Sequence, residues 1–307
     1  MKYIHVFLLL LINTNLAIAQ EPKVSSGSID YIESFPSAYT KSRAVYIWKP
    51  RAYSPEKKYA VLYMHDGQML FDSSITWNHQ EWHVDETMSA LLDQQKIQDC
   101  IVVGIANGAA DRHREYCPLQ PFLSLPAYYK DSLIYMAKRQ NGNALFSEQV
   151  ISDRYLKFIV NELKPFVDKQ YSTYQDRSHT FIAGSSMGGL ISLYAICEYP
   201  NVFGGAICMS THWPLTFTAA NNPFPNAMFD YMSRKLPNPK HHKIYFDYGD
   251  QTLDAIYGEF QQRADAIMVK KKFSKNNWET LFFSGDDHSE RSWSKRLSIS
   301  LEFMLKR

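Results

Sequence analysis

The chain has 307 residues, of which 45% are apolar, and its 33 lysines and arginines nearly balance its 31 aspartates and glutamates. This composition is typical of a globular protein with a sizeable core, and it excludes a disordered or fibrous chain. A net charge of +2 without a basic run gives little attraction to phosphate backbones, so we expect no nucleic-acid partner.

The chain begins with a pattern typical of exported proteins. Lys2 precedes an apolar run over residues 6–12, and an Ala-x-Ala triplet follows as a cleavage signal. The run is too short to span a bilayer. We therefore expect residues 1–19 to be a signal peptide and residues 20–307 to form one exported domain, periplasmic or extracellular, without membrane contact after cleavage. An uncleaved membrane anchor is the alternative.

Strands and helices alternate along the rest of the chain. Apolar runs predict strands at residues 42–48, 59–64, 101–105, 180–183, 205–209, 243–248 and 278–283. Apolar residues at helical spacing predict helices at residues 84–92, 150–167, 188–199, 253–271 and 293–305. The first two strands look antiparallel, and the βαβ units that follow predict an α/β fold with a mostly parallel central sheet and helices on both faces.

Two long segments interrupt this alternation, at about residues 109–146 and 212–239. Both are rich in proline and aromatic residues. Long insertions in a compact domain are commonly lids or binding loops, so we expect these two to form walls of the active site. Trp213, in the second insertion, is the candidate for contact with substrate. Surface elaboration without a binding role is the alternative.

The chain contains four cysteines, Cys100, Cys117, Cys197 and Cys208, which allow three pairings if they are oxidised. Cys197 falls in a helical pattern and Cys208 in an apolar strand, where free buried cysteines are common. We therefore predict no disulfide.

The motif G-x-S-x-G occurs at residues 184–188, between a predicted strand and a predicted helix, which is the context of a nucleophile elbow. Such a sharp turn holds its serine in a strained conformation, and the flanking glycines avoid Cβ clashes. The start of the following helix points backbone N–H groups at a developing oxyanion. We predict Ser186 as the nucleophile and the amide of Met187 as an oxyanion donor. A plain Gly/Ser turn is the alternative.

A catalytic serine needs a histidine base that is held by a carboxylate. With this motif the chain order is Ser, then Asp or Glu, then His after the last strand, and His288 occupies that place. Three aspartates compete for the acid. Asp247 lies inside a predicted strand and is expected to be structural, whereas Asp250 and Asp254 lie in the loop that follows it.

The loop after the strand at residues 59–64 should supply the second oxyanion donor, as in other hydrolases of this layout. That donor is the amide of Gln68 or of its neighbour Gly67, and we favour Gln68. His79 and His83 are four residues apart, but the zinc-protease motif needs Glu where Gln80 stands. We therefore expect no metal and no other cofactor.

Several motifs together resemble those of the putative esterase family, the esterase D and enterochelin-esterase-like group of α/β-hydrolases that includes the family 1 carbohydrate esterases. They are Met64-His65-Asp66-Gly67-Gln68, Gly184-Ser185-Ser186-Met187-Gly188-Gly189, Thr252-Leu253-Asp254, and Asp287-His288 with Trp293. The resemblance covers nearly all the mature chain, favours Asp254 as the acid, and implies a metal-free serine esterase. The usual Gly-x-His of the family is replaced here by Gly-Asp-Asp-His at residues 285–288.

The expected function is an exported esterase acting on small-molecule or polysaccharide esters, such as acetyl or feruloyl esters of carbohydrate, or on siderophore-like esters. Aromatic residues suit phenolic and sugar rings because both stack on Tyr and Trp. An exported acyltransferase with the same triad, or a non-catalytic binding protein on a hydrolase scaffold, are the alternatives.

Overall fold

A computed structural model of the chain describes residues 21–307, except residues 139–141, 147, 218 and 220. The predicted signal peptide, residues 1–19, lies outside these residues. None of the described helices combines the length and the apolar character that a membrane span requires.

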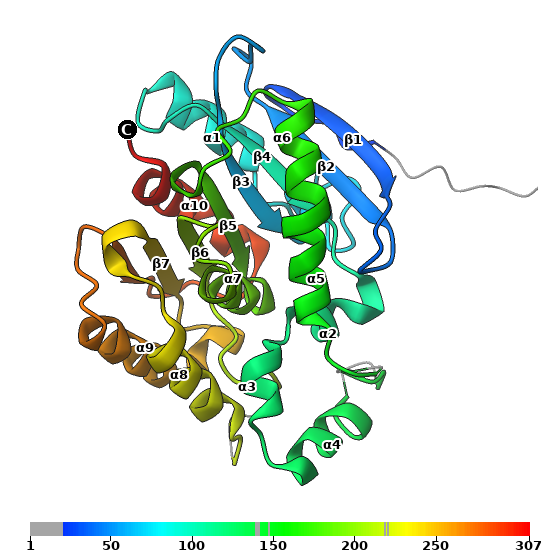
Figure 1. Ribbon diagram of the computed structural model, residues 1–307, viewed down its shortest axis with the longest axis vertical. Helices are drawn as coiled ribbons and strands as arrows, with labels where there is room; N and C mark the ends of the chain where they lie inside the picture. Colours follow the sequence, from blue (N-terminus) through cyan, green and yellow to red (C-terminus); the bar gives the residue numbers. More distant parts are fainter. Residues whose placement is uncertain (1–20, 139–141, 147, 218, 220) are drawn as a thin grey trace, which may run out of the picture.

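The described strands form one eight-stranded sheet in the order β1-β2-β4-β3-β5-β6-β7-β8, with helices on both faces (Figure 1). The strands are β1 (Ser28–Phe35), β2 (Arg43–Lys49), β3 (Ala60–His65), β4 (Cys100–Ile105), β5 (Thr180–Ser185), β6 (Gly205–Met209), β7 (Lys243–Tyr248) and β8 (Trp278–Phe282). The pairs β1-β2 and β2-β4 are antiparallel, and the others are parallel. The predicted α/β fold with a mostly parallel sheet is confirmed.

Two apolar cores form because the central strands are buried on both faces. Along β3, Val61 and Tyr63 face one core, and Leu62 and Met64 face the other. The first core lies under α5 (Ser152–Phe158), the π-helical turn η3 (Ile159–Leu163), α6 (Lys164–Gln170), α7 (Met187–Glu198), α8 (Phe224–Lys235) and α9 (Gly258–Lys270). The second lies under α1 (Val84–Asp93) and α10 (Glu290–Leu305). The four cysteines are free and buried in these cores.

The start of the sheet differs from the expectation. β2 runs antiparallel to both of its neighbours, but these neighbours are β1 and β4 rather than β3. β1 was not predicted from the sequence. Its residues are mostly half-buried or exposed, as expected of an edge strand, and its sequence SIDYIESF carries too many polar residues to give a buried-strand signal.

The two insertions contain short helices and contact each other. The first contains α2 (Arg112–Tyr116), α3 (Leu119–Leu123) and α4 (Ala127–Tyr135), and the second contains all of α8. Figure 1 shows α3, α4 and α8 gathered at one end of the molecule, where α3 packs against α8. Tyr129 and Phe217, one from each insertion, line the same small hollow.

Candidate active site

The predicted catalytic residues follow the carboxyl ends of neighbouring parallel strands. Ser186 follows β5, Asp254 lies in the loop after β7, and His288 lies in the loop after β8. Carboxyl ends of parallel strands meet at one edge of a sheet, which is where open α/β folds bind ligands. Ser186 and His288 line the same cavity of about 560 Å³ at this edge.

Ser186 occupies a sharp turn between β5 and α7. Its backbone has φ 57° and ψ −122°, a conformation that residues with a Cβ rarely adopt. The turn also brings Gly184 against Gly188: a Cβ on Gly184 would lie 2.7 Å from the carbonyl carbon of Gly188. The Ser186 amide donates to the Met209 carbonyl at the end of β6 at 2.9 Å. The local sequence therefore folds as the elbow that the motif predicts.

His288 is held by two groups of the loop that precedes α9. Its Nδ1 lies 2.5 Å from Oδ1 of Asp254, and its backbone amide donates to Oγ1 of Thr252 at 2.9 Å. The ring also packs edge-on against Trp293, with centroids 5.0 Å apart. Burial acts to raise the pKa of Asp254, but its hydrogen bonds and the charge of His288 outweigh burial and lower that pKa. Asp254 is therefore an ionised partner for Nδ1 of the base.

The other two candidate aspartates have different partners. Asp250 accepts from the Gly285 amide at 2.8 Å and the Ser284 hydroxyl at 3.0 Å, and so ties two loops together. Asp247 is fully buried, with its Oδ1 2.9 Å from Nη2 of Arg296. Burial outweighs this ion pair and raises the pKa of Asp247 to about 6. Of the three aspartates, Asp254 is the one whose carboxylate contacts His288.

A buried hydrogen-bond network holds the Asp254 carboxylate through its second oxygen, Oδ2. The Ser210 hydroxyl donates to Oδ2 of Asp254 at 2.6 Å. Ser210 in turn accepts from Nη2 of Arg296 at 2.7 Å and from Nε1 of Trp293 at 3.0 Å. Sequence reasoning missed this network because Ser210 and Arg296 lie 86 positions apart and neither forms part of a recognisable motif.

The two predicted oxyanion donors come from adjacent segments. Met187 is the first residue of α7, so its amide has no acceptor within the helix. Gln68 lies in the short helix η1 (Gly67–Met69), and its side-chain Oε1 accepts from the Asn107 amide at 3.2 Å. A Cβ on Gly188 would lie 3.4 Å from atoms of His65 and Asp66, so the start of α7 adjoins the segment before η1. Their oxyanion role stays a prediction.

A second histidine lies buried beside the nucleophile. Nδ1 of His212 lies 2.6 Å from the hydroxyl of Tyr257, which also hydrogen-bonds with Ser186. Burial lowers the pKa of His212 to about 3, so its ring is neutral at physiological pH. The Tyr257 ring packs edge-on against His288, with centroids 5.8 Å apart. His212 is buried and is not among the residues that line the cavity of Ser186.

The structure corrects the expectation for Trp213. Its side chain is fully buried in the core and does not line the cavity. Its Nε1 donates to Oε1 of Gln261 at 3.2 Å, and its ring packs against Phe229 with centroids 5.2 Å apart. Trp213 is thus a core residue, because the strand that precedes it directs this side chain under α8.

The aromatic walls of the cavity come from other segments than the insertions. Trp77 and Trp82 lie in the loop between η1 and α1, and Trp293 lies in the first turn of α10. Trp77 is 82% exposed, an unusual position for so large an apolar side chain. The complete lining is Asp66, Trp77, Asn78, Gln80, Trp82, Asn107, Arg112, Ser185, Ser186, His288, Ser289, Glu290 and Trp293. Among the described residues, the segment 212–239 contributes nothing to it.

One residue of the first insertion does reach the cavity. Arg112 pairs with Asp66 through two bonds, Nε to Oδ1 at 2.7 Å and Nη2 to Oδ2 at 2.8 Å. Burial acts to raise the pKa of Asp66, but the charge and hydrogen bonds of Arg112 outweigh burial and lower that pKa. The pair is therefore ionised, and it fixes the insertion against the segment that leads into η1.

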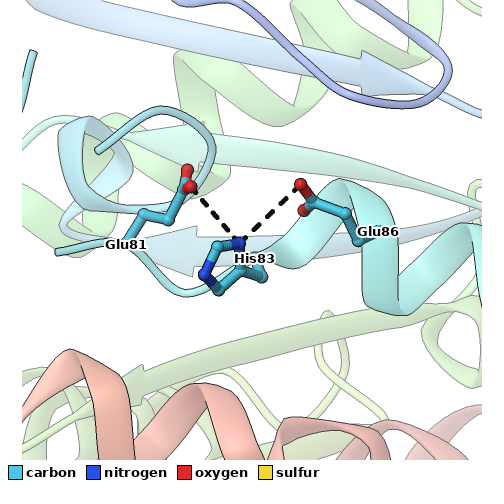
Figure 2. Close-up of side chains that lie close together, drawn as sticks. All are labelled: Glu81, His83 and Glu86. Atoms are coloured by element: carbon cyan, nitrogen blue, oxygen red, sulfur yellow. Dashed lines mark ion pairs between the residues drawn. The ribbon is translucent and has the colours of Figure 1, made fainter. Parts of the chain in front are cut away.

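One group of side chains in the described part of the chain has donors spaced to hold a cation. Figure 2 shows the ring of His83 between the carboxylates of Glu81 and Glu86. His83 Nδ1 lies 3.2 Å from Oε1 of Glu81 and 3.7 Å from Oε1 of Glu86, and the three ligand atoms lie within 4.8 Å of one another. His83 is near only one oxygen of each glutamate, and the other oxygens, Oε2 of Glu81 and of Glu86, are buried without a hydrogen-bond partner among the described residues. That the chain uses no metal stays a prediction.

Comparisons with known proteins agree with this geometry. The sequence profile of the family described as "Putative esterase" matches residues 37–304. The uncharacterized protein YjcH of Bacillus subtilis is 24% identical over 287 residues, which cover 91% of this chain and 98% of YjcH. The enterobactin esterase FES from Shigella flexneri superposes with a TM-score of 0.64 at 16% identity, covering 92% of this chain and 60% of FES. The CE1 ferulic acid esterase from Anaeromyces mucronatus, solved with ferulic acid, gives a TM-score of 0.60 at 16% identity over 92% of both chains.

Proposed function

The chain belongs to the putative esterase family, and from this premise we propose that it is an exported serine esterase that cleaves carboxylic esters through an acyl-enzyme on Ser186. One observation carries the proposal. Ser186, strained at the elbow, and His288, held by Asp254, line one cavity at the carboxyl edge of the sheet. A nucleophile and a base oriented by a carboxylate are the groups that acyl transfer requires.

The first step forms the acyl-enzyme. The Ser186 oxygen attacks the ester carbonyl carbon while Nε2 of His288 takes the hydroxyl proton, and Asp254 stabilises the imidazolium through Nδ1. The carbonyl oxygen becomes an oxyanion, which the amides of Met187 and Gln68 stabilise. Collapse of the tetrahedral intermediate breaks the carbon–oxygen bond of the ester, and His288 gives its proton to the departing alcohol.

The second step releases the acid. A water molecule attacks the acyl carbon of the acyl-enzyme, and His288 takes a proton from it. The new tetrahedral intermediate expels the Ser186 oxygen, which recovers its proton from His288. The products are a carboxylic acid and the free enzyme. An alcohol in place of water would make the same site an acyltransferase.

The substrate is proposed to be an ester of an aromatic acid or of a carbohydrate, such as a feruloyl or acetyl ester, or a siderophore-like ester. Three tryptophans, Trp77, Trp82 and Trp293, border the cavity of Ser186 and offer flat apolar surfaces for such rings. The solved structures with this fold include enzymes named for ferulic acid and enterobactin esters.

A labelling experiment tests the nucleophile. The mature protein should react with a fluorophosphonate probe and hydrolyse p-nitrophenyl acetate, and Ser186→Ala should lose both. The expected loss in turnover is about 10⁶-fold, because no other group can form the acyl-enzyme. Ser185→Ala is the matched control and should still react. Substantial activity in the Ser186→Ala variant would contradict the assignment.

The ester class and the acceptor need separate measurements. A panel of acetyl, feruloyl and longer esters should show preference for aryl or sugar esters over long acyl chains. Product analysis with an added alcohol separates hydrolysis from transfer, since a hydrolase releases mainly free acid. Export is tested by the intact mass of the secreted protein, which should begin at Gln20.

A further inference from the structure

A second hollow lies at the amino edge of the parallel strands, at the opposite end of the sheet from Ser186. It has a volume of about 630 Å³ and is lined by residues that precede or begin β5 to β8, together with the end of α10. A neighbouring hollow of about 500 Å³ shares Lys243, Asn276 and Lys306 with it. We call these two connected hollows the basic groove. Strands of five or six residues separate it from the cavity of Ser186 by about 17–20 Å.

The larger hollow carries only positive charge. No aspartate or glutamate lines it, whereas Arg177, Lys240, Lys243 and Lys306 all do. None of these four cations forms an ion pair with any of the described residues. On a chain whose net charge is only +2, this is a local concentration of unpaired charge.

Two of the lysines repel each other across the groove. Lys243 is half-buried at the start of β7, and its Nζ donates to the Phe303 carbonyl oxygen at 3.5 Å. Burial lowers the pKa of Lys243, and the charge of Lys306 lowers it further. An anion between these two ammonium groups would relieve both effects, because it would replace the lost hydration and cancel the repulsion.

One further donor of the larger hollow favours an anion. Nε of Arg177 is buried and has no hydrogen-bond partner in the described part of the chain. Both ring nitrogens of His242 are occupied by the backbone, because Nδ1 and Nε2 each lie 2.8 Å from a carbonyl oxygen, those of Asn238 and Pro200. An anion bound in the hollow would supply the acceptor that Nε of Arg177 lacks.

The groove also offers neutral hydrogen-bonding groups between its cations. Amide and hydroxyl side chains line the larger hollow, namely Gln98, Ser178, Ser274, Asn276 and Asn277. The smaller hollow contains Glu279 and Glu302, and Glu302 already pairs with Lys96 at 3.3 Å. The positive charge is therefore concentrated in the larger hollow. Lys243 and Lys306, which line both hollows, extend this positive charge to the border of the smaller one.

We propose that the basic groove binds an acidic oligosaccharide, a sugar chain that carries carboxylate groups, at a site remote from the esterase cavity. The separated lysines match carboxylates spaced along a chain, and the amides and hydroxyls between them match sugar hydroxyls. A single-stranded nucleic acid would need exposed aromatic platforms. In the groove, Phe181 is only 4% exposed, and Phe303 is half-buried with the Lys243 ammonium 6.0 Å from its ring centroid. The groove would retain the enzyme on an acidic polysaccharide, whatever ester the cavity accepts.

The test is a direct binding measurement on the full mature protein. Tetragalacturonic acid should bind saturably by titration calorimetry, and neutral maltotetraose should not. Raising NaCl from about 50 to about 300 mM should weaken this binding, because exposed charges are screened. Lys240→Glu/Lys306→Glu should weaken it at least about tenfold, because charge reversal makes the groove repel carboxylates. Lys157→Glu/Lys169→Glu, which makes the same change of net charge outside the groove, should bind as the wild type does.

Binding and catalysis are read separately. Both double variants should keep the wild-type melting temperature and the wild-type rate on p-nitrophenyl acetate, because all four lysines are exposed and lie outside the cavity of Ser186. If the protein hydrolysed no ester, the binding result would still stand or fall by itself. The proposal is overturned by absence of saturable tetragalacturonate binding, by equal losses in the two double variants, or by tighter binding of a single-stranded oligonucleotide or phosphatidylglycerol vesicles to the same lysines.

Discussion

Ser186 is held in its strained conformation by the backbone around it rather than by its own side chain. Its amide donates to Met209, and its carbonyl accepts from the amides of Leu190 and His212 at 3.1 Å each. A strained backbone of this kind costs roughly 1–3 kcal/mol and persists only where its surroundings over-determine it. These three bonds join β6, α7 and the loop after β6, so the position of Ser186 depends on the packed framework of the sheet.

The aspartate assignment gives a prediction with an internal control. Asp254→Asn should lower turnover by roughly 10⁴-fold at pH 7, because the amide cannot stabilise the imidazolium of His288. Asp250→Asn should keep near wild-type turnover, because Asp250 bonds the neighbouring loop and not the base. Steady-state kinetics on p-nitrophenyl acetate measures both. Equal losses in the two variants would mean that loop order, and not the contact with His288, sets the rate.

Trp77 is predicted to contribute to substrate binding and not to stability. Its side chain is 82% exposed at the border of the cavity. Trp77→Ala should raise KM for feruloyl esters about fivefold, since a ring contact is worth about 1 kcal/mol, and should leave kcat and KM for a simple acetate nearly unchanged. Tyr128→Ala removes a similarly exposed ring from α4, away from the cavity, and should change neither. An unchanged KM for feruloyl esters in Trp77→Ala would exclude this contact.

At the scale of elements, the junction of β5 with α7 is a tightly constrained contact beside Ser186. Gly184→Ala would place a Cβ within 2.9 Å of three backbone atoms of Gly188, which cannot move without shifting α7. We expect a loss of about 2 kcal/mol or more in the free energy of unfolding, and a fall in kcat.

Gly258, at the start of α9, is the matched control for this junction. A Cβ there meets only Tyr248, at 3.8 Å, so Gly258→Ala should be neutral or stabilise by up to about 1 kcal/mol. Urea denaturation of both variants measures the difference. If both substitutions changed the free energy of unfolding equally, close packing against Gly188 would not explain why the motif has glycine at position 184.

The elements that could be predicted from sequence are those buried on both sides. β6 and β7 have the predicted bounds, and β3, β4 and β5 differ from them by one or two residues, because continuous apolar runs indicate a strand whichever face they turn to the core. β8 is a half-buried edge strand, and it ends one residue before the predicted bound. The short helices α2, α3 and α4 were missed, since five to nine residues with prolines give little helical periodicity. Residues 253–271 contain a break, because η6 (Thr252–Ile256) precedes α9 and carries Asp254.

At the scale of the whole molecule, local motifs led to Ser186, His288 and Asp254 because each directly follows a predictable strand. The rest of the cavity could not be found in this way. Trp77 and Trp82 lie in an irregular loop, and Arg112 lies in a short helix of an insertion. Neither segment has a repeating pattern of apolar residues from which the direction of these side chains could be predicted. The prediction that Trp213 contacts substrate was wrong, because a segment rich in aromatic residues can equally well line a binding site or pack in the core, and Trp213 is buried in the core.

The dependence of folding stability on pH is also a property of the whole molecule, and buried groups contribute to it with opposite signs. Burial lowers the pKa values of His65 and His212 to about 3, so acid favours the unfolded chain, in which these rings can take up protons. Burial raises the pKa values of Asp247 and Asp85, so acid favours the folded chain, in which these carboxyls take up protons first. The contributions largely offset each other, and a single variant is needed to expose one of them.

His212→Asn should expose the contribution of that ring, and the asparagine oxygen can still accept from the Tyr257 hydroxyl. In the unfolded chain His212 binds a proton as pH falls below its ordinary pKa of 6.5, while in the folded chain it stays neutral down to about 3. The stability of the wild type relative to the variant should therefore fall by about 1.4 kcal/mol per pH unit between about pH 6 and pH 4, and should be constant above about pH 7. Urea denaturation of the wild type and the variant at several pH values measures this difference. Parallel curves for His212→Asn would mean that the ring is protonated in the folded protein, and that Tyr257 accepts a hydrogen bond from it instead of donating one.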